Sequence, residues 1–203
     1  VVERQLYMLG YRNAKAHFGR VAVENCDWTD VARLNMFLRS GERVLVCLAT
    51  FRAENFDELF DGVRNIAWQD YLTPDSRVTV ITKTVNSKLF AHNAIQSIGK
   101  KAIVAAVTPH FGGLTEGGDE YVVELALRDD IVSVNLDTSG TGLHKRGYRP
   151  LTYTAPLKET TAAALIDLSV WNPDKMFTDL FCGSGTLCIE AALKALKIAP
   201  GLN

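Results

Sequence analysis

A short loop near the C-terminal end of the chain carries the residue pattern most suited to chemistry. In Asp179-Leu180-Phe181-Cys182-Gly183-Ser184-Gly185-Thr186, two glycines separate an apolar run from an amphipathic stretch. This predicts a strand over 176–181, a tight loop and a helix over 186–198. Glycine lets the backbone approach a ligand closely, and the first turn of a helix offers N–H groups to it. The spacing therefore indicates a candidate binding site for a small molecule.

The residues around the two glycines narrow the choice of ligand. A nucleoside-triphosphate loop needs Gly-Lys-Ser/Thr, which is missing, and a dinucleotide loop needs a third glycine where Cys188 stands. Asp179, placed just before the glycines, suits a cofactor with a positive charge, such as the sulfonium and amino groups of S-adenosylmethionine. Glycines also serve simple tight turns, so the pattern alone leaves a purely structural loop open. Cys182 has no base nearby in the sequence, which disfavours a nucleophilic role.

The charged residues are distributed unevenly along a chain whose net charge is only -1. Residues 76–115 contain five Lys or Arg and no acid, residues 116–137 contain seven acids and one Arg, and residues 138–158 contain four bases and no acid. Such blocks are expected if one face meets a polyanion, although a cluster of solvated lysines gives the same pattern. The candidate nucleic-acid ligands are Lys83, Lys88, Lys100, Lys101, Lys145, Arg146 and Arg149.

The overall composition, 203 residues of which 47% are hydrophobic, indicates a globular protein of one or two domains. The four cysteines lack the spacing of a zinc site, so we expect no metal and reduced, mostly buried thiols. No apolar run approaches the roughly 20 residues that cross a bilayer, which favours a cytoplasmic protein outside the membrane. The chain has no initiator Met and opens within a predicted helix, so both ends look truncated. We expect Trp28, Trp68 and Trp171 to anchor the core.

Hydrophobic periodicity predicts the elements that position these residues. In the first 75 residues we expect a helix over 1–9, a hairpin within 13–25, a helix over 27–38, a strand over 42–50 and a helix capped by Asn55. Further on we expect strands over 77–85, 120–127 and 131–137, and a helix over 93–108 that Pro109 stops. This order predicts a mixed sheet with helices on one face. After a linker, a helix over 156–171 should bury a stripe formed by Leu157, Leu165, Leu168 and Trp171.

Three ordered motifs resemble those of the THUMP-domain class I S-adenosylmethionine-dependent RNA methyltransferases. The first is Leu136-Asp137-Thr138-Ser139-Gly140 with Leu143-His144-Lys145-Arg146-Gly147-Tyr148-Arg149. The others are Ala155-Pro156-Leu157-Lys158-Glu159 and the glycine loop followed by Ile189-Glu190-Ala191-Ala192-Leu193. The similarity covers nearly the whole chain. The close relatives are the bacterial 23S rRNA guanine-N2 methyltransferases, which are often labelled predicted N6-adenine-specific DNA methylases.

The resemblance implies an α/β chain with an α+β N-terminal part. It implies a partial ferredoxin-like region over 1–41, a THUMP RNA-binding domain over 42–137, a basic linker over 138–154 and the start of a Rossmann-like methyltransferase domain over 155–203. S-adenosylmethionine would lie against Asp179, Phe181, Cys182, Gly183, Ser184, Gly185 and Thr186, beside the helix start at Lys158, Glu159 and Thr160. Lys83, Lys88, Lys100 and Lys101 match where a THUMP domain would meet RNA phosphates. Family members usually carry Pro where Leu180 stands, a mild departure.

The resemblance further implies methyl transfer to an exocyclic base nitrogen, with guanine N2 of large-subunit rRNA as the expected target. The family's catalytic Asn/Asp-Pro-Pro-Tyr/Phe segment would lie beyond Asn203, so we expect no catalytic residue in this chain and no turnover by it alone. Two other functions stay open: a DNA adenine-N6 methylase, because amine methylases share that segment, and a non-catalytic THUMP RNA-binding protein. Glu190, four residues into the last predicted helix, either orients the loop or faces solvent.

Overall fold

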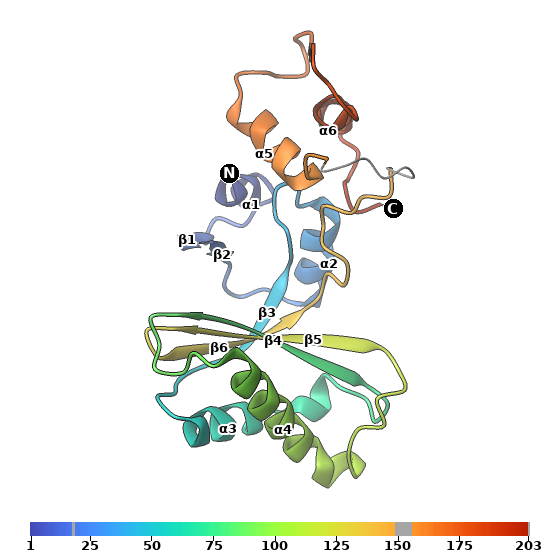
Figure 1. The fold of residues 1–203 in the computed structure, drawn as a ribbon. Helices are drawn as coiled ribbons and strands as arrows, with labels where there is room; N and C mark the ends of the chain where they lie inside the picture. Colours follow the sequence, from blue (N-terminus) through green and yellow to red (C-terminus); the bar gives the residue numbers. More distant parts are fainter. Residues whose placement is uncertain (18, 149–155, 203) are drawn as a thin grey trace. The chain divides into compact units, whose positions relative to one another are not determined.

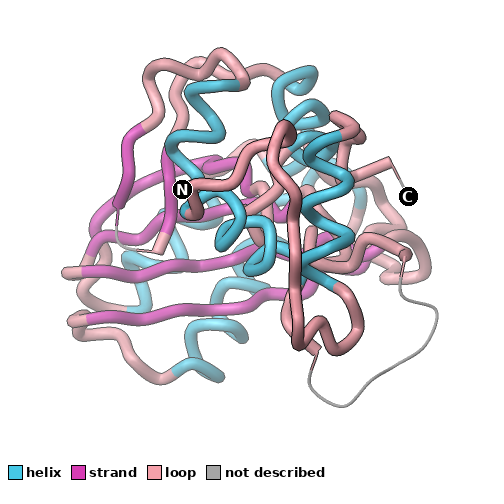
Figure 2. Tube along the Cα trace, turned by 90° about the horizontal axis from the view of Figure 1, so that it is seen from above, coloured by secondary structure: helices cyan, strands magenta, loops and turns pink. Residues whose placement is uncertain are grey.

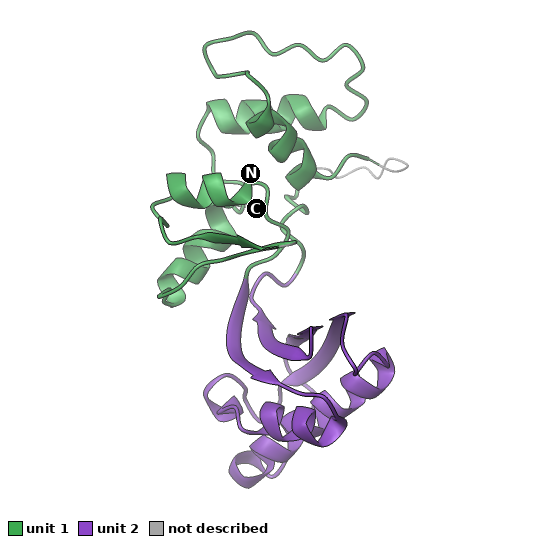
Figure 3. Ribbon diagram, turned by 90° about the vertical axis from the view of Figure 1, so that its left-hand side faces the viewer, with its two compact units in different colours: residues 1–44, 141–203 green, residues 45–140 purple. Residues whose placement is uncertain are grey.

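The computed structural model describes residues 1–17, 19–148 and 156–202. The chain divides into two compact units, coloured separately in Figure 3. Unit 1 contains residues 1–44 and 141–203, and unit 2 contains residues 45–140. Arg149, one of the basic residues singled out by the sequence, lies outside the described residues.

Unit 2 is built on a four-stranded mixed sheet, whose strands lie side by side in Figure 2. The strand order is β3 (Leu45–Arg52), β6 (Ile131–Asp137), β5 (Glu120–Arg128) and β4 (Arg77–Val85). β4 and β5 run parallel, and the other two pairs are antiparallel. The β5–β6 hairpin turns at Asp129 and Asp130, whose φ angles of 51° and 62° are those of a tight type I′ turn. The predicted mixed sheet is confirmed.

Two helices, α3 (Phe56–Arg64) and α4 (His92–Phe111), cover one face of this sheet (Figure 1), together with the short 3-10 helix η1 (Trp68–Asp70). Asn55 caps α3 as predicted, because its side chain accepts the Glu58 N–H. Trp68 is fully buried and donates its indole N–H to the Val63 carbonyl at 2.8 Å. A Cβ on Gly99 would lie 2.5 Å from a Leu125 methyl, so α4 approaches the sheet closely at this glycine.

The predicted end of α4 is wrong, because the helix continues past Pro109 to Phe111. Proline removes the N–H that would bond the carbonyl four residues earlier, but here it falls in the last turn, where few further hydrogen bonds are lost. The helix ends instead at Gly112, whose φ of 76° is left-handed and whose N–H donates to Thr108 at 2.8 Å.

Unit 1 contains four helices and one small hairpin among its described residues. They are α1 (Val2–Met8), β1 (Lys15–His17) paired with β2 (Arg20–Ala22), α2 (Trp28–Phe37), α5 (Glu159–Leu168) and α6 (Thr186–Ala195). Asp27 and Asp30 close a capping box at the start of α2. Leu6, Leu34, Leu38 and Val44 form a core against which Leu143 packs, so the segment that begins at residue 141 joins the first 44 residues.

The predicted strand over 176–181 does not form, and the segment between α5 and α6 is turns and irregular chain (Figure 1). A strand needs a neighbour for its backbone hydrogen bonds. The strands among the described residues of unit 1 are β1 and β2, which pair with each other. Met176, Leu180 and Phe181 are therefore exposed, Phe181 by 95%.

The predicted apolar stripe of the following helix is also wrong. α5 runs over 159–168 rather than 156–171, and it buries Ala162, Ala163 and Ile166 while Leu157, Leu165 and Leu168 remain exposed. α5 packs directly against α6, and two of the three apolar residues it buries are alanines.

The exposure of several other residues differs from expectation. Trp68 is a core anchor, but Trp28 is exposed and Trp171 is half-buried, with its ring edge-on to Phe177. Cys26, Cys47 and Cys182 are exposed rather than buried, and Cys188 is half-buried. Within the described residues, every helix is too short or too polar to traverse a bilayer.

Candidate cofactor loop and RNA-binding residues

The glycine loop lies directly before α6 and leaves its backbone open to a ligand. Gly183 and Gly185 have φ angles of 52° and 73°, a left-handed conformation that favours glycine. A Cβ on Gly183 would meet no atom within 4 Å, so the loop surface is open there. The Gly185 N–H donates to the Cys182 carbonyl at 2.7 Å, which closes the turn. The predicted tight loop is confirmed.

Gly185 is also the N-cap residue of α6, and among the described residues no side chain caps this helix end. The first-turn N–H groups carry the positive end of the helix dipole, which attracts a carboxylate or phosphate. Asp179 lies at the other end of the loop, where its carboxylate accepts the Phe181 N–H at 3.1 Å. The loop thus presents an acid at one end and a helix N-terminus at the other, which suits a zwitterionic ligand.

The remaining loop residues divide into exposed and buried groups. Phe181, Cys182 and Gly183 are exposed, whereas Thr186 is 3% exposed, with its hydroxyl 3.2 Å from that of Ser184. Thr186 is thus shielded from solvent, and the exposed residues are those that a ligand could reach.

The side chains at the start of α5 contact the carboxylate of Glu42. Lys158 and Thr160 contact the carboxylate of Glu42, at 3.3 and 3.1 Å, and His144 Nδ1 lies 2.6 Å from the same carboxylate. Glu159 and Thr160 are both buried. Burial raises the pKa of Glu42, but the bonds from Lys158 and Thr160 and the nearby His144 outweigh it, so the pKa lies below its ordinary value. These polar contacts lead to Glu42 rather than to the glycine loop.

The basic residues of the acid-free segment are largely paired in space. Lys83 lies 2.6 Å from Glu124, Lys100 lies 2.7 Å from Glu116, and Lys88 pairs with Glu54. The hydrogen bond with Glu54 raises the pKa of Lys88, and the pKa of Glu54 is lowered. Lys101, on the outer side of α4, is exposed. Counting charges along the sequence therefore overestimates the uncompensated positive charge of this segment.

Arg146 is not available to a phosphate, which corrects its prediction as an RNA ligand. It is 3% exposed and forms an ion pair with Glu190, which is 1% exposed. Its neighbour Lys145 is exposed. The Tyr148 hydroxyl donates to Glu190 at 2.8 Å, so Glu190 has two partners from the same segment. The sequence alone did not identify this site, because the apolar neighbours Ile189, Ala191 and Ala192 do not lie on the same helix face as Glu190.

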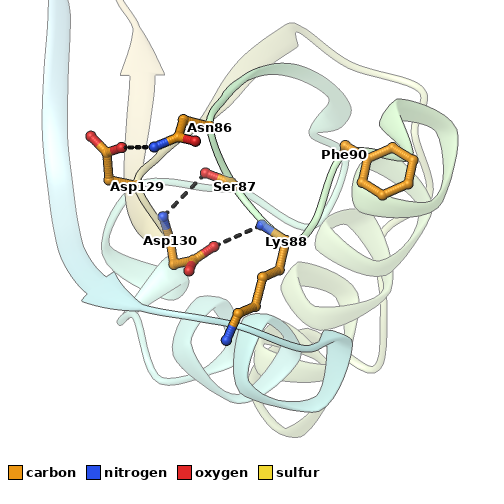
Figure 4. Close-up of a pocket in the computed structure, with 6 residues that line it drawn as sticks. All are labelled: Asn86, Ser87, Lys88, Phe90, Asp129 and Asp130. Atoms are coloured by element: carbon orange, nitrogen blue, oxygen red, sulfur yellow. Dashed lines mark hydrogen bonds between the residues drawn. The ribbon is translucent and has the colours of Figure 1, made fainter.

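A shallow hollow of about 610 Å³ lies in unit 2, beside the tip of the β5–β6 hairpin (Figure 4). The side chains around it are Asn86, Ser87, Lys88, Phe90, Asp129 and Asp130. Lys88 N–H donates to Asp130 at 2.7 Å, and the Asp130 N–H donates to the Ser87 hydroxyl at 3.2 Å. The Phe90 ring is 73% exposed. Sequence reasoning did not find this hollow, because its residues come from two separate loops.

The chain matches three family models, which follow one another along the sequence. They are the RlmL ferredoxin-like domain over residues 1–45, the THUMP domain over 53–137 and the RMKL-like methyltransferase domain over 146–203. In this order, the three matches and the glycine loop resemble a THUMP-domain methyltransferase, the class of protein to which the chain is similar.

The relatives agree with this class. The chain is 44% identical over 207 residues to YpsC of Bacillus subtilis, named as an RNA methyltransferase, and the match takes in 100% of this chain and 53% of that protein. A solved structure of a predicted N6-adenine-specific DNA methylase from Listeria monocytogenes is 43% identical, with a TM-score of 0.94 over 100% of this chain and 53% of that one. SMU.472, a methyltransferase solved with SAH, is 42% identical, with a TM-score of 0.91 over 100% of this chain and 54% of that one. The chain thus spans about half the length of these relatives.

Proposed function

We propose that this chain is the RNA-binding and cofactor-loop portion of an S-adenosylmethionine-dependent RNA methyltransferase. The observation that carries the proposal is the open glycine loop at the start of α6, which lies within the segment that matches a methyltransferase domain and follows a THUMP domain. The target we propose is an exocyclic base nitrogen, with guanine N2 of large-subunit rRNA as the expected one.

We expect the loop to supply contacts for S-adenosylmethionine. The cofactor provides the transferable methyl group when bound. The Asp179 carboxylate would face its cationic groups, and the N–H groups at the start of α6 would face its carboxylate. Phe181, Cys182 and Gly183 would line the ligand from the exposed side of the loop. The complex of SMU.472 with SAH supports a cofactor of this type.

RNA recognition would rest on the THUMP domain, where exposed Lys101 is the residue best placed to meet a phosphate. Lys83, Lys88 and Lys100 would have to exchange a carboxylate partner for RNA. Lys145 is the exposed candidate in unit 1. The name of the Bacillus relative supports RNA as the substrate.

Cofactor binding is tested by calorimetric titration of the natural full-length protein with S-adenosylmethionine. Asp179→Asn should weaken binding about tenfold, because a charge-assisted contact is lost. Asp174→Asn, which neutralises an exposed acid a few residues earlier, is the matched control and should bind like the wild type. Equal affinities for the wild type and Asp179→Asn would remove Asp179 from the proposed site.

A DNA adenine methylase is the second candidate, favoured by the name of the Listeria structure. Transfer of labelled methyl groups by the full-length protein to protein-free 23S rRNA and to duplex DNA of equal nucleotide content decides between them. Methylation of the RNA supports our proposal, and methylation of the duplex DNA alone would replace it with the second.

A further inference from the structure

We infer that Arg146 and Tyr148 act through Glu190 as positioning residues for the cofactor loop, an inference that rests on the proposed function. Glu190 and Thr186 are four residues apart on α6 and therefore share a face of the helix, and both are buried. The loop ends where this helix begins. The contacts of Glu190 thus fix the rotation of the helix that presents its N–H groups to the cofactor.

Glu190 is held from both sides of its carboxylate. Arg146 Nη1 donates to Oε2, and the Tyr148 hydroxyl donates to Oε1 at 2.8 Å. Arg146 is itself fixed, because its Nε donates to the Leu143 carbonyl at 3.2 Å and its Nη2 donates to the Arg39 carbonyl. The guanidinium is therefore part of a rigid backbone frame rather than a mobile surface charge.

A second guanidinium holds the other end of α6. Arg39 donates to the Leu193 carbonyl at 3.3 Å and to the Ile198 carbonyl, at the last turn of the helix and just beyond it. The backbone carbonyl of Arg39 also accepts the hydrogen bond from Arg146 Nη2. Two arginines thus fix α6 along its axis as well as around it, and residues 39 and 146 link the helix to both segments of unit 1.

This arrangement differs from an ordinary surface ion pair, since the Arg146 and Glu190 side chains are 1% and 0% exposed. Arg39 also faces Glu190: burial lowers the pKa of Arg39, and Glu190 acts in the opposite direction. Neutralising Glu190 would leave buried positive charge without its anion, and α6 would shift to bring water to it. A shift of the helix would move the loop, and small displacements of a positioned group have large effects.

The experiment compares affinities for SAH in the natural full-length protein, measured by calorimetry at a temperature where each variant is folded. Glu190→Gln should raise the Kd about tenfold or more. Asp167→Asn is the matched control, because it breaks another pair between α5 and α6, in which Asp167 lies 2.6 Å from Lys194. It should lower the melting temperature but change the Kd by less than about twofold.

Tyr148→Phe keeps the test decisive even if Glu190→Gln fails to fold, since it removes only the hydroxyl that donates to Glu190. Its Kd for SAH should rise severalfold. A Tyr148→Phe or Glu190→Gln variant that is destabilised like Asp167→Asn yet binds SAH like the wild type would overturn the inference. A wild type that does not bind SAH would instead contradict the proposed function, so the two failures are distinguishable.

Discussion

The ammonium of Lys83 on β4 lies 2.6 Å from the carboxylate of Glu124 on the neighbouring strand β5. The Lys83 side chain is 66% exposed, whereas that of Glu124 is 3% exposed, so the pair joins a solvated cation to a buried anion. Asn135 Nδ2 donates to the same carboxylate at 3.3 Å. Lys83 therefore compensates a buried acid in the sheet, and its role as an RNA ligand has to compete with this one.

Removal of Lys83 should cost stability. In Lys83→Met the Glu124 carboxylate keeps its hydrogen bond from Asn135 but loses the ion pair with Lys83. We expect the free energy of unfolding to fall by about 1 kcal/mol. This is below the range for a fully buried pair, because the Lys83 side chain is solvated. Urea unfolding monitored by fluorescence measures the change. The double variant Lys83→Met/Glu124→Gln should recover most of it. A single variant as stable as the wild type would show that Lys83 does not stabilise the buried acid.

Lys101 and Lys100 should differ in their effect on RNA binding, although they are adjacent on α4. Lys101 is exposed, whereas Lys100 pairs with Glu116. If Lys101 meets a phosphate, Lys101→Ala should reduce the slope of log K against log salt by about 1. Lys100→Ala should reduce it less, since RNA must first displace Glu116. Filter binding to structured RNA over a salt series measures both slopes. Identical slopes for Lys101→Ala and the wild type would exclude Lys101 from the interface.

Gly183→Ala should lower both the stability of the protein and its affinity for the cofactor, and a control variant separates these two effects. The φ of 52° makes alanine unfavourable by about 1 kcal/mol, and the added Cβ projects into open space where the cofactor would lie. Gly140→Ala is the matched control, because Gly140 has a φ of 59° and no atom within 4 Å of a Cβ. We expect similar losses of stability from both variants, and weaker S-adenosylmethionine binding in calorimetry from Gly183→Ala alone. Wild-type affinity in Gly183→Ala would place the ligand elsewhere.

Glu42 should make the stability of the protein depend on pH. Its pKa in the folded state is lowered from the ordinary value of 4.5, so the folded state binds a proton less readily than the unfolded one. The stabilisation is present above the ordinary pKa and is lost as the pH falls through the lowered value. The wild type should thus melt above Glu42→Gln at about pH 6, and the difference between the two should shrink as the pH falls below the ordinary pKa of 4.5, in scanning calorimetry. A constant difference across this range would contradict the lowered pKa.

The sequence predicts the regular parts of this fold well, because their signals are local. We expected β4 over 77–85, where the structure has it. The alternation of apolar and polar residues over 120–127 and 131–137 correctly predicted the β5–β6 hairpin. The failures arise where the outcome depends on distant residues. The apolar run over 176–181 has strand character, but no neighbouring strand among the described residues of unit 1 pairs with it.

The predictions for the candidate site likewise depend on whether the signal is local or involves distant residues. The two glycines marked the loop correctly, since a left-handed φ is a property of single residues. The prediction for Arg146 was wrong because a count of charges along the chain does not reveal its ion pair with Glu190, which lies 44 residues away in the sequence. Lys158 and Thr160 were placed beside the loop by resemblance, whereas their polar contacts go to Glu42.

The division of the chain into units has a consequence for the order of folding during synthesis. Unit 2 is one continuous segment, residues 45–140, whereas unit 1 is assembled from two segments on either side of it. Unit 2 is therefore complete when residue 140 leaves the ribosome. The core around Leu6, Leu34 and Leu38 is incomplete until Leu143 has been synthesised. The hydrogen bond from Arg146 to the Arg39 carbonyl likewise forms only after residue 146 has been synthesised. Residues 1–44 are thus synthesised before unit 2 but meet native partners that are synthesised after it, which lengthens the time during which they depend on protection by chaperones.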